Sequence, residues 1–258
     1  MDLGLQGARV LVTAGAGGIG LEIARAFLRE GATVHVCDID RDTLAKLRQS
    51  DPKLTASRAD VADRADVTRL LDEALGTLGG LDVLVNNAGI AGPTGRVEEI
   101  NPEDWDRTLQ VCITGQYNCA RLAIPHLRKS ANPSIVNLSS AAGKLGFALR
   151  TPYAAAKWAV IGFTKSLAIE LGPDNIRVNA ILPGIVAGDR QRRVLEAKAQ
   201  QRGVSFAEME RIAFSFTSIK DYVTPQQIAD QVVFICSTRG RTISGQAIAV
   251  DGDTQMLS

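Results

Sequence analysis

Short β-prone runs alternate with helical stretches along the whole chain, and this alternation is its most restrictive feature. Residues 20–30 and 153–171 carry apolar side chains at helical spacing, and the runs between such stretches are short and β-prone. A chain of this kind builds a parallel sheet with helices on both faces, and right-handed crossovers leave few topologies. The sequence therefore predicts a doubly wound, seven-stranded, mainly parallel α/β sheet. The expected strands are 10–12, 34–37, 54–56, 81–85, 134–138, 177–181 and 247–250, of which 54–56 is the weakest.

Length and composition favour one domain. The chain has 258 residues, of which 45% are hydrophobic and 22% charged, and it contains no linker, solenoid repeat or low-complexity tract. We therefore expect a single domain over residues 1–258. The segment of about 188–223 differs from the rest, because it is rich in Arg, Gln and Glu and interrupts the alternation before the last strand. It is predicted to form an inserted helical cap over the strand ends.

Charge and cysteine content argue against several classes of partner. The formal net charge is +1 and the charges are scattered, so we expect neither nucleic acid nor a membrane as a partner. No apolar run approaches the ~18 residues of a membrane span, and no leader pattern opens the chain, which predicts a cytoplasmic protein. No Cys-x-x-Cys pair is present, so neither a metal site nor a disulfide is expected. The cysteines are Cys37, Cys112, Cys119 and Cys236.

A glycine cluster follows the first expected strand directly and opens the first helix. In residues 13–20, Gly17, Gly18 and Gly20 let the backbone approach a pyrophosphate, and the helix N-terminus offers free N–H groups. A glycine cluster alone is also typical of a tight turn. Here Asp38 ends the second strand, where a carboxylate accepts hydrogen bonds from the adenosine ribose and repels a 2′-phosphate. The pattern predicts a dinucleotide site that prefers NAD to NADP.

Tyr153 and Lys157 lie one turn apart at the start of an expected helix. A tyrosine with its ordinary pKa of about 10 is a poor base at neutral pH, and a nearby ammonium lowers that pKa. Ser140 follows the strand 134–138 at the carboxyl edge of the sheet, where ligands bind. A Tyr-x-x-x-Lys pair alone also occurs on surface helices. Together with the serine and the glycine cluster it predicts hydride transfer between a nicotinamide and a secondary alcohol or ketone.

With these motifs the chain resembles the short-chain dehydrogenase/reductase family, in its larger group, over essentially its whole length. The family's glycine loop is matched at Thr13, Gly18 and Gly20, and Ala14 stands in place of its first glycine. The resemblance implies one Rossmann-type domain that binds a nicotinamide cofactor. The positions assigned to cofactor contact are Ala14, Gly17, Gly18, Ile19, Gly20, Asp38, Ile39, Asp60, Val61, Asn87, Ala88, Gly89, Tyr153, Lys157, Pro183, Gly184 and Val186.

The same resemblance implies a catalytic group made of Ser140, Tyr153, Lys157 and the position of Cys112. It selects Ser140 over the neighbouring Ser139. Cys112 departs from the family, which carries an Asn there whose backbone carbonyl holds a water in a proton relay with the lysine. Because a cysteine keeps that carbonyl, we expect altered turnover and retained chemistry. The helix kink that the amide usually holds would need another cause.

Two arginines suggest the kind of substrate. Arg150 precedes Tyr153 by about one turn, and Arg190 lies at the start of the expected cap. An arginine in a mostly apolar cleft suits bidentate capture of a carboxylate. We therefore expect Arg150 and Arg190, with Ser140 and Tyr153, to bind a small polar or acidic alcohol or ketone, such as a sugar acid or hydroxy acid. Each arginine could equally face water or a neighbouring subunit.

Two other functions remain open. A 3-oxoacyl-thioester reductase has the same fold and chemistry but would normally prefer NADPH, against which Asp38 argues. A non-catalytic NAD-binding regulatory protein is suggested by the departures from the family at Ala14, Cys112 and Gly188, the last of which replaces a threonine.

The resemblance also implies a homotetramer. In it, the long helices after the fourth and fifth strands pack against a partner subunit. Residues 107–127 and 153–171 carry apolar side chains on more than one helical face, which is consistent with such contacts.

Overall fold

The computed structural model describes residues 2–257, which contain one sheet of seven strands. The strand order is β3-β2-β1-β4-β5-β6-β7, and every pairing is parallel. The order reverses between β1 and β4, which is where open parallel sheets bind their ligands. The predicted sheet is confirmed, including its weak third strand. The strands are β1 (Arg9–Thr13), β2 (Thr33–Asp38), β3 (Thr55–Arg58), β4 (Val83–Asn86), β5 (Ser134–Leu138), β6 (Arg177–Pro183) and β7 (Ala247–Val250).

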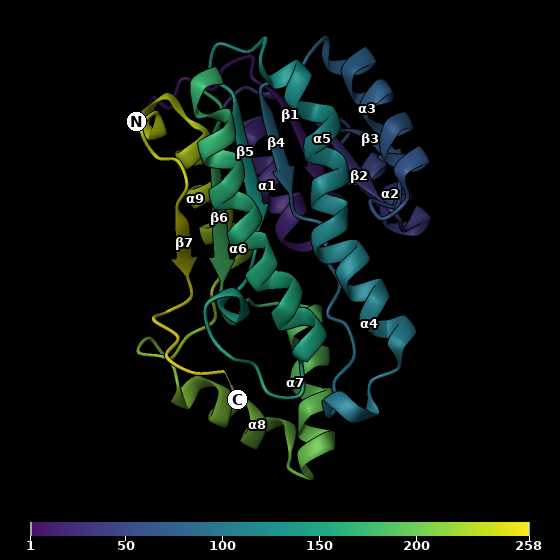
Figure 1. Ribbon diagram of the computed structural model, residues 1–258, viewed down its shortest axis with the longest axis vertical. Coiled ribbons are helices and arrows are strands. Elements are labelled where there is room, and N and C mark those ends of the chain that lie inside the picture. The colour runs from purple at the N-terminus through teal and green to yellow at the C-terminus, as the bar shows by residue number, and fades with distance from the viewer. Residues whose placement is uncertain (1, 258) are drawn as a thin grey trace.

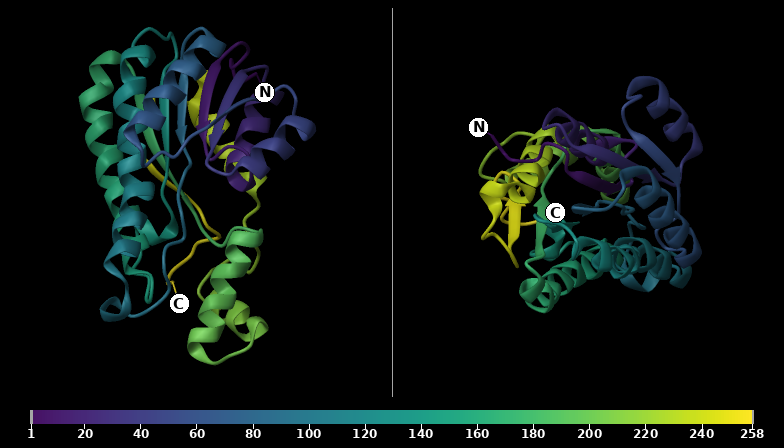
Figure 2. Two further views of the ribbon diagram at one scale, coloured as in Figure 1. Left: turned by 90° about the vertical axis from the view of Figure 1, so that its right-hand side faces the viewer. Right: turned by 90° about the horizontal axis from the view of Figure 1, so that it is seen from above.

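Helices cover both faces of this sheet (Figures 1 and 2). Successive side chains of a strand point to opposite faces, so Val10 and Val12 pack in one core and Leu11 packs in the other. The first core lies beneath α1 (Gly18–Arg29), α2 (Arg41–Ser50) and α9 (Pro225–Cys236). The second lies beneath α3 (Arg64–Leu78), α5 (Gly115–Leu127) and α6 (Thr151–Leu171).

Local sequence sets several helix ends. The side chain of Asp63 accepts hydrogen bonds from the first turn of α3, and Thr224 forms a capping box with Gln227 at the start of α9. The helix α4 (Pro102–Leu109) begins at a proline, and Asn101 caps it. Single helical turns lie at Val97–Glu99, Ala141–Gly143, Gly172–Asp174 and Thr238–Gly240.

The helix expected over 107–127 is not continuous. A π-helical segment, Gln110–Thr114, separates α4 from α5 and contains the buried Cys112. Such a segment widens the helix by one residue per turn and is frequent at functional sites. It supplies the kink that the family's amide was expected to hold. The thiol of Cys112 donates to the carbonyl oxygen of Ile90 at 3.4 Å, which ties this segment to the loop after β4.

The arginine-rich segment forms the helices α7 (Asp189–Arg202) and α8 (Phe206–Ser215), as predicted. They lie beyond the carboxyl ends of the strands (Figures 1 and 2). Their buried apolar contacts, centred on Leu195 and Met209, form a small cluster apart from the two sheet cores. A parallel β-bridge joins Val186 to Val223, so the two ends of this helical segment lie next to each other.

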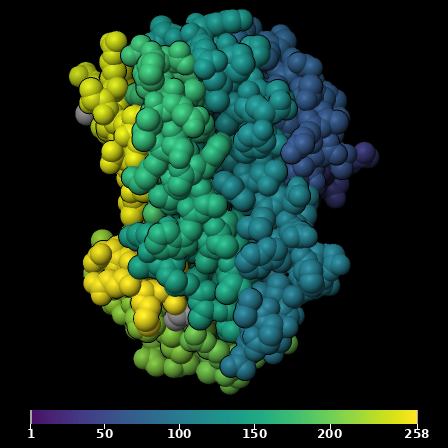
Figure 3. Space-filling view, in the orientation of Figure 1, coloured from purple at the N-terminus to yellow at the C-terminus, as the bar shows by residue number. Residues whose placement is uncertain are grey.

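The helices α5 and α6 run side by side on one outer face of the molecule (Figure 3). Both are long and partly apolar, yet no helix within residues 2–257 is long and apolar enough to span a membrane.

Candidate active site

The turn from β1 into α1 leaves open space at a helix N-terminus. A Cβ atom on Gly18, whose φ is +53°, would meet nothing within 4 Å, and one on Gly17 would meet only Thr43 at 3.7 Å. On the inner side, a Cβ on Gly20 would lie 2.2 Å from the carbonyl oxygen of Ala14. The loop is therefore closely packed at Gly20 and has open space at Gly17 and Gly18. That open space at a helix N-terminus fits a bound pyrophosphate.

Asn87 holds this turn from the neighbouring strand. Its amide donates to the carbonyl oxygens of Thr13 and Ala14, each at 3.0 Å. The hydroxyl of Thr13 in turn accepts from the backbone N–H groups of Asn87 and Ala88, each at 3.0 Å. Ala14 has a φ of +47°, the left-handed region in which a glycine would be relaxed. Ala14 therefore keeps the backbone conformation in which the family has a glycine, at the cost of strain at this one residue.

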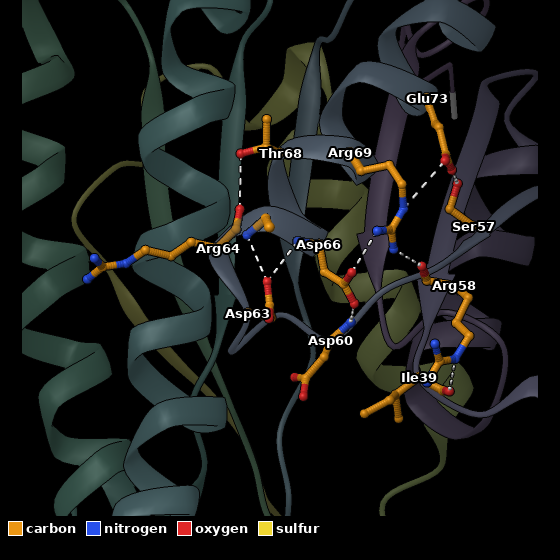
Figure 4. Close-up of polar contacts among 11 residues, drawn as sticks. Ile39, Ser57, Arg58, Asp60, Asp63, Arg64, Asp66, Thr68, Arg69 and Glu73 are labelled. Carbon is orange, nitrogen blue, oxygen red and sulfur yellow. Dashed lines mark hydrogen bonds and ion pairs between the residues drawn. The ribbon is translucent and has the colours of Figure 1, made fainter.

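The adenine end of the candidate cofactor site is rich in charge (Figure 4). Half-buried Asp38 ends β2, and beside it Arg58 donates from Nε to the carbonyl oxygen of exposed Ile39 at 3.2 Å. The carboxylate of Asp60 accepts from the backbone of Ala62 at 2.9 Å and forms an ion pair with Arg107 at 2.8 Å.

The remaining predicted cofactor positions line the same edge of the sheet. Val61 is buried and accepts a hydrogen bond from Asn118 at 3.0 Å. Pro183 ends β6, and the N–H of Gly184 donates to Val250 at 3.0 Å. A Cβ on Gly184 would lie 2.6 Å from the Cα of Asp251, so this turn requires glycine. Ile19 opens α1, and Ala88, Gly89 and Val186 lie in the loops after β4 and β6.

Lys157 and Tyr153 share one face of α6, and Ser140 lies opposite them after β5. The Lys157 ammonium is buried, donates to the carbonyl oxygen of Leu138 at 2.8 Å and lies 5.6 Å from the centre of the Tyr153 ring. Ser140 Oγ accepts from the N–H of Ala142 at 3.1 Å. Ser139 is buried instead and donates to the carbonyl oxygen of Lys157 at 2.8 Å.

The surroundings of Tyr153 lower its pKa. Burial alone would raise this pKa, but the positive charges of Lys157 and Arg190, together with a hydrogen bond from Ser140, outweigh that effect. The phenol is thereby prepared to give up its proton more readily than an ordinary tyrosine.

Cys112 and Lys157 both lie close to Gly89. A Cβ on Gly89 would lie 3.4 Å from the Lys157 ammonium and 3.6 Å from the Cys112 sulfur. The predicted position of Cys112 within the group around Tyr153 therefore agrees with the geometry, although its role stays a prediction.

A pocket of about 370 Å³ opens beside Tyr153. Residues 89–92, Val194 and Ala197 form its apolar wall, and no acidic side chain of the described residues lines it. The guanidinium carbons of Arg150 and Arg190 lie 5.3 Å and 5.9 Å from the centre of the Tyr153 ring. Its polar lining side chains are Thr94, Arg150, Arg190 and Arg193.

The structure thus brings both predicted substrate arginines to Tyr153. Arg150 is 2% exposed, and its Nη2 donates to the carbonyl oxygen of Ala91, whereas Arg190 is exposed and donates to Gly89 at 3.2 Å. Sequence reasoning missed Phe147 and Lys198: the Phe147 ring centre lies 5.5 Å from the guanidinium carbon of Arg150 and 3.9 Å from the ammonium of Lys198. The only sequence signal for the burial of Lys198 was its place near the apolar residues Leu195 and Ala199, which face the same side of α7.

Comparison with known proteins identifies the family of the chain. Residues 13–253 match the family described as Enoyl-(Acyl carrier protein) reductase. Together with the fold and the close relatives, this places the chain in the short-chain dehydrogenase/reductase family. It is therefore an oxidoreductase that acts on alcohol or ketone groups with a nicotinamide cofactor.

Three relatives illustrate the range of that family. The chain is 35% identical to the 3-oxoacyl-[acyl-carrier-protein] reductase FabG of Thermotoga maritima, with 96% of this chain and 98% of the relative covered. It is 32% identical to the D-beta-hydroxybutyrate dehydrogenase of Cupriavidus necator, with the same coverage of 96% and 98%. Its fold matches the L-sorbose reductase of Gluconobacter frateurii, solved with NADPH and L-sorbose, at a TM-score of 0.90 and 29% identity over 98% of each chain.

Proposed function

We propose that this protein is an NAD-dependent dehydrogenase/reductase of a small acidic substrate, such as a hydroxy acid or sugar acid. The observation that carries the proposal is the pocket beside Tyr153, in which the charged lining side chains Arg150, Arg190 and Arg193 are all cationic. A carboxylate in this pocket gains charge-assisted hydrogen bonds in an apolar setting. The name of the Cupriavidus relative, a hydroxybutyrate dehydrogenase, supports a substrate of this class.

The residues around Tyr153 then have distinct roles in alcohol oxidation. Ser140 holds the substrate oxygen, and Tyr153, whose pKa is lowered, accepts the hydroxyl proton. Lys157 stabilises the resulting phenolate by its charge. The nicotinamide, when bound, accepts the hydride, and in the reverse direction Tyr153 returns the proton to the substrate oxygen.

Asp38 supports NAD over NADP. Its carboxylate lies at the end of β2, where it repels a 2′-phosphate. The sorbose reductase was solved with NADPH, and Arg58 lies beside Ile39, so the preference needs a direct test. Asp38→Ala is expected to relax the preference for NAD by about tenfold or more, measured as the ratio of kcat/KM for the two cofactors. An unchanged ratio would show that a group other than Asp38 determines the preference between NAD and NADP.

The test of the function is the absorbance of reduced nicotinamide with a substrate panel. The panel holds sugar acids, hydroxy acids, neutral secondary alcohols and, in the reducing direction, acetoacetyl thioesters. Preferred turnover of an acid with NAD supports the proposal, and Tyr153→Phe should abolish that turnover. Turnover restricted to neutral alcohols would contradict it.

A 3-oxoacyl-thioester reductase is the second candidate, because the Thermotoga relative carries that name. Preferred reduction of acetoacetyl thioesters would establish it. Binding of NAD without turnover of any compound would instead favour a non-catalytic regulatory role.

We also propose that the protein is a homotetramer. The exposed apolar side chains of α5 and α6, Tyr117, Trp158 and Ile169, support subunit contacts through these helices.

A further inference from the structure

Arg190 joins α7 to the body of the protein and lies against Tyr153. Its guanidinium carbon is 5.9 Å from the centre of the Tyr153 ring, and its Nη1 donates to the carbonyl oxygen of Gly89 at 3.2 Å. Gly89 follows β4, and a Cβ on it would lie 3.4 Å from the Lys157 ammonium. Arg190 therefore brings a positive charge from α7 to the phenol that Lys157 faces from α6.

The stability of α7 itself does not explain this arginine. Arg190 lies in the first turn of the helix, where the positive end of the helix dipole disfavours a cation. The N-cap residue Gly188 offers no side-chain hydrogen bond to that turn, and Asp189 is its single acidic residue. The favourable contacts of Arg190 are instead those that it makes across the pocket, with Gly89 and Tyr153.

Titratable and charged groups face Tyr153 from several elements. Burial raises the pKa of the phenol, but the charges of Lys157 and then Arg190 lower it overall. A hydrogen bond from Ser140, after β5, acts in the same direction, whereas Cys112 of the π-helical segment acts in the opposite one. Two cations from different elements thus favour the phenolate.

Arg150 is the remaining cation beside the ring. Its guanidinium carbon lies 5.3 Å from the ring centre, and its Nη2 donates to the carbonyl oxygen of Ala91. It directly precedes α6, the helix that carries both Tyr153 and Lys157, so these three side chains are positioned by one segment. Arg190 is the cation that α7 adds to them.

We propose that Arg190 acts through Tyr153: held over the ring by Gly89, its charge stabilises the phenolate together with that of Lys157. This inference rests on the proposed function, in which Tyr153 exchanges the proton, and it divides the pocket arginines between two tasks. Arg150 and Arg193 remain for the carboxylate of the substrate. Because Arg190 is exposed and water screens its charge, its effect should be smaller than that of Lys157. The position of α7 then influences how easily the base of the reaction ionises.

The first test titrates the phenol without substrate. The chain has three tyrosines, so the absorbance of ionised tyrosine that is lost on adding Tyr153→Phe to each protein isolates the titration of Tyr153. The apparent pKa of Tyr153 should be higher by about half a unit or more in Arg190→Met, and Arg190→Lys should recover most of this difference.

The matched control for this titration is Arg192→Met. It removes a neighbouring arginine of α7 whose side chain is 72% exposed and pairs with Glu196, and it should leave the titration of Tyr153 unchanged. An unchanged titration in Arg190→Met, or an equal shift in Arg192→Met, would overturn the inference.

Kinetics separate this role from substrate binding and from the proposed function. With 3-hydroxybutyrate and NAD, Arg190→Met should move the pH profile of kcat/KM upward by the same amount and leave KM at high pH within about twofold. A raised KM with an unmoved profile would assign Arg190 to the carboxylate, which overturns the inference and leaves the function standing. If the phenol titration shifts but no acid is oxidised, only the proposed function fails.

Discussion

Lys157 makes two contacts that affect the ionisation of the Tyr153 phenol. It donates to Leu138 at 2.8 Å, which holds it in place, and its ammonium faces the Tyr153 ring. Its charge is one of the effects that lower the pKa of the phenol. The neighbouring Arg190 contributes in the same direction, so the two cations share the stabilisation of the phenolate.

Replacing this ammonium should move the pH profile of the reaction. In Lys157→Met the pKa of Tyr153 rises, so alcohol oxidation should require a pH about one unit or more higher, and turnover at neutral pH should fall about tenfold or more. The measurement is kcat/KM for alcohol oxidation from pH 6 to 10. Lys165→Met, which removes an exposed lysine from the same helix, should leave the profile unchanged. A profile unaltered by Lys157→Met would contradict the role of its charge.

His35 is a buried histidine of β2 whose ionisation is expected to affect stability in acid. It is 3% exposed, and its ring nitrogens hydrogen-bond to the hydroxyls of Thr55 and Ser57, each at 2.8 Å. Burial lowers its pKa to about 4, and the nearby Glu73 opposes this only in part. Ser57 also donates to Glu73 (Figure 4).

The depressed pKa makes stability depend on pH. Between about pH 6.5 and pH 4 the unfolded chain binds a proton at His35 that the folded chain does not, so stability falls as the pH falls through this range. By pH 4.5 the loss amounts to about 2–3 kcal/mol. Urea unfolding from pH 7.5 to 4.5 should therefore show a smaller loss for His35→Gln than for the wild type. An equal loss of unfolding free energy in the two proteins between pH 7.5 and 4.5 would contradict this account.

Two helical glycines differ in the space around them. Gly20 belongs to α1, where a Cβ would lie 2.2 Å from Ala14 O and 2.5 Å from Asn87 Nδ2. Gly76 lies on the exposed side of α3, has no special φ, and would place a Cβ in open space.

Alanine at these two sites should change stability in opposite directions. Gly76→Ala should raise the free energy of unfolding by about 0.5–1 kcal/mol, because alanine is the better helix former. Gly20→Ala should lower it and weaken NAD binding, because the added methyl group separates Asn87 from the turn. Thermal unfolding and NAD titration measure both effects. Normal NAD affinity in Gly20→Ala would refute the described packing.

Elements with a strong local signal were predictable from the sequence. The strands 134–138 and 247–250 have the predicted bounds, because β-branched runs bounded by turn residues define them. The π-helical break at Gln110–Thr114 left no comparable signal, since the packing of Cys112 against Ile90 joins segments distant in sequence. Lys198 was missed for a similar reason. It packs against Phe147 from another part of the chain, which helical periodicity alone does not reveal.

Three large apolar side chains on the outer helices α5 and α6 are exposed to solvent. On α5 and α6 the side chains of Tyr117, Trp158 and Ile169 are 44%, 52% and 80% exposed. Large exposed apolar side chains on neighbouring helices are consistent with the proposed subunit contacts.

A charge on this face should weaken the assembly. Ile169→Glu is expected to shift a tetramer toward smaller species, measured by light scattering over a range of protein concentrations. Ile219→Glu places the same charge at an exposed isoleucine after α8 and should leave the mass unchanged. A wild-type mass of one subunit at all concentrations would contradict the proposed tetramer.

The bridge between Val186 and Val223 has a consequence for how such a protein can change over time. The two ends of the α7–α8 segment lie side by side, and its apolar cluster shares no buried residue with the sheet cores. Closing a loop of different length between ends that are already adjacent costs little additional entropy. Insertions, deletions or exchange of this segment could therefore give a new substrate preference in few evolutionary steps, while Ser140, Tyr153 and Lys157 stay in place.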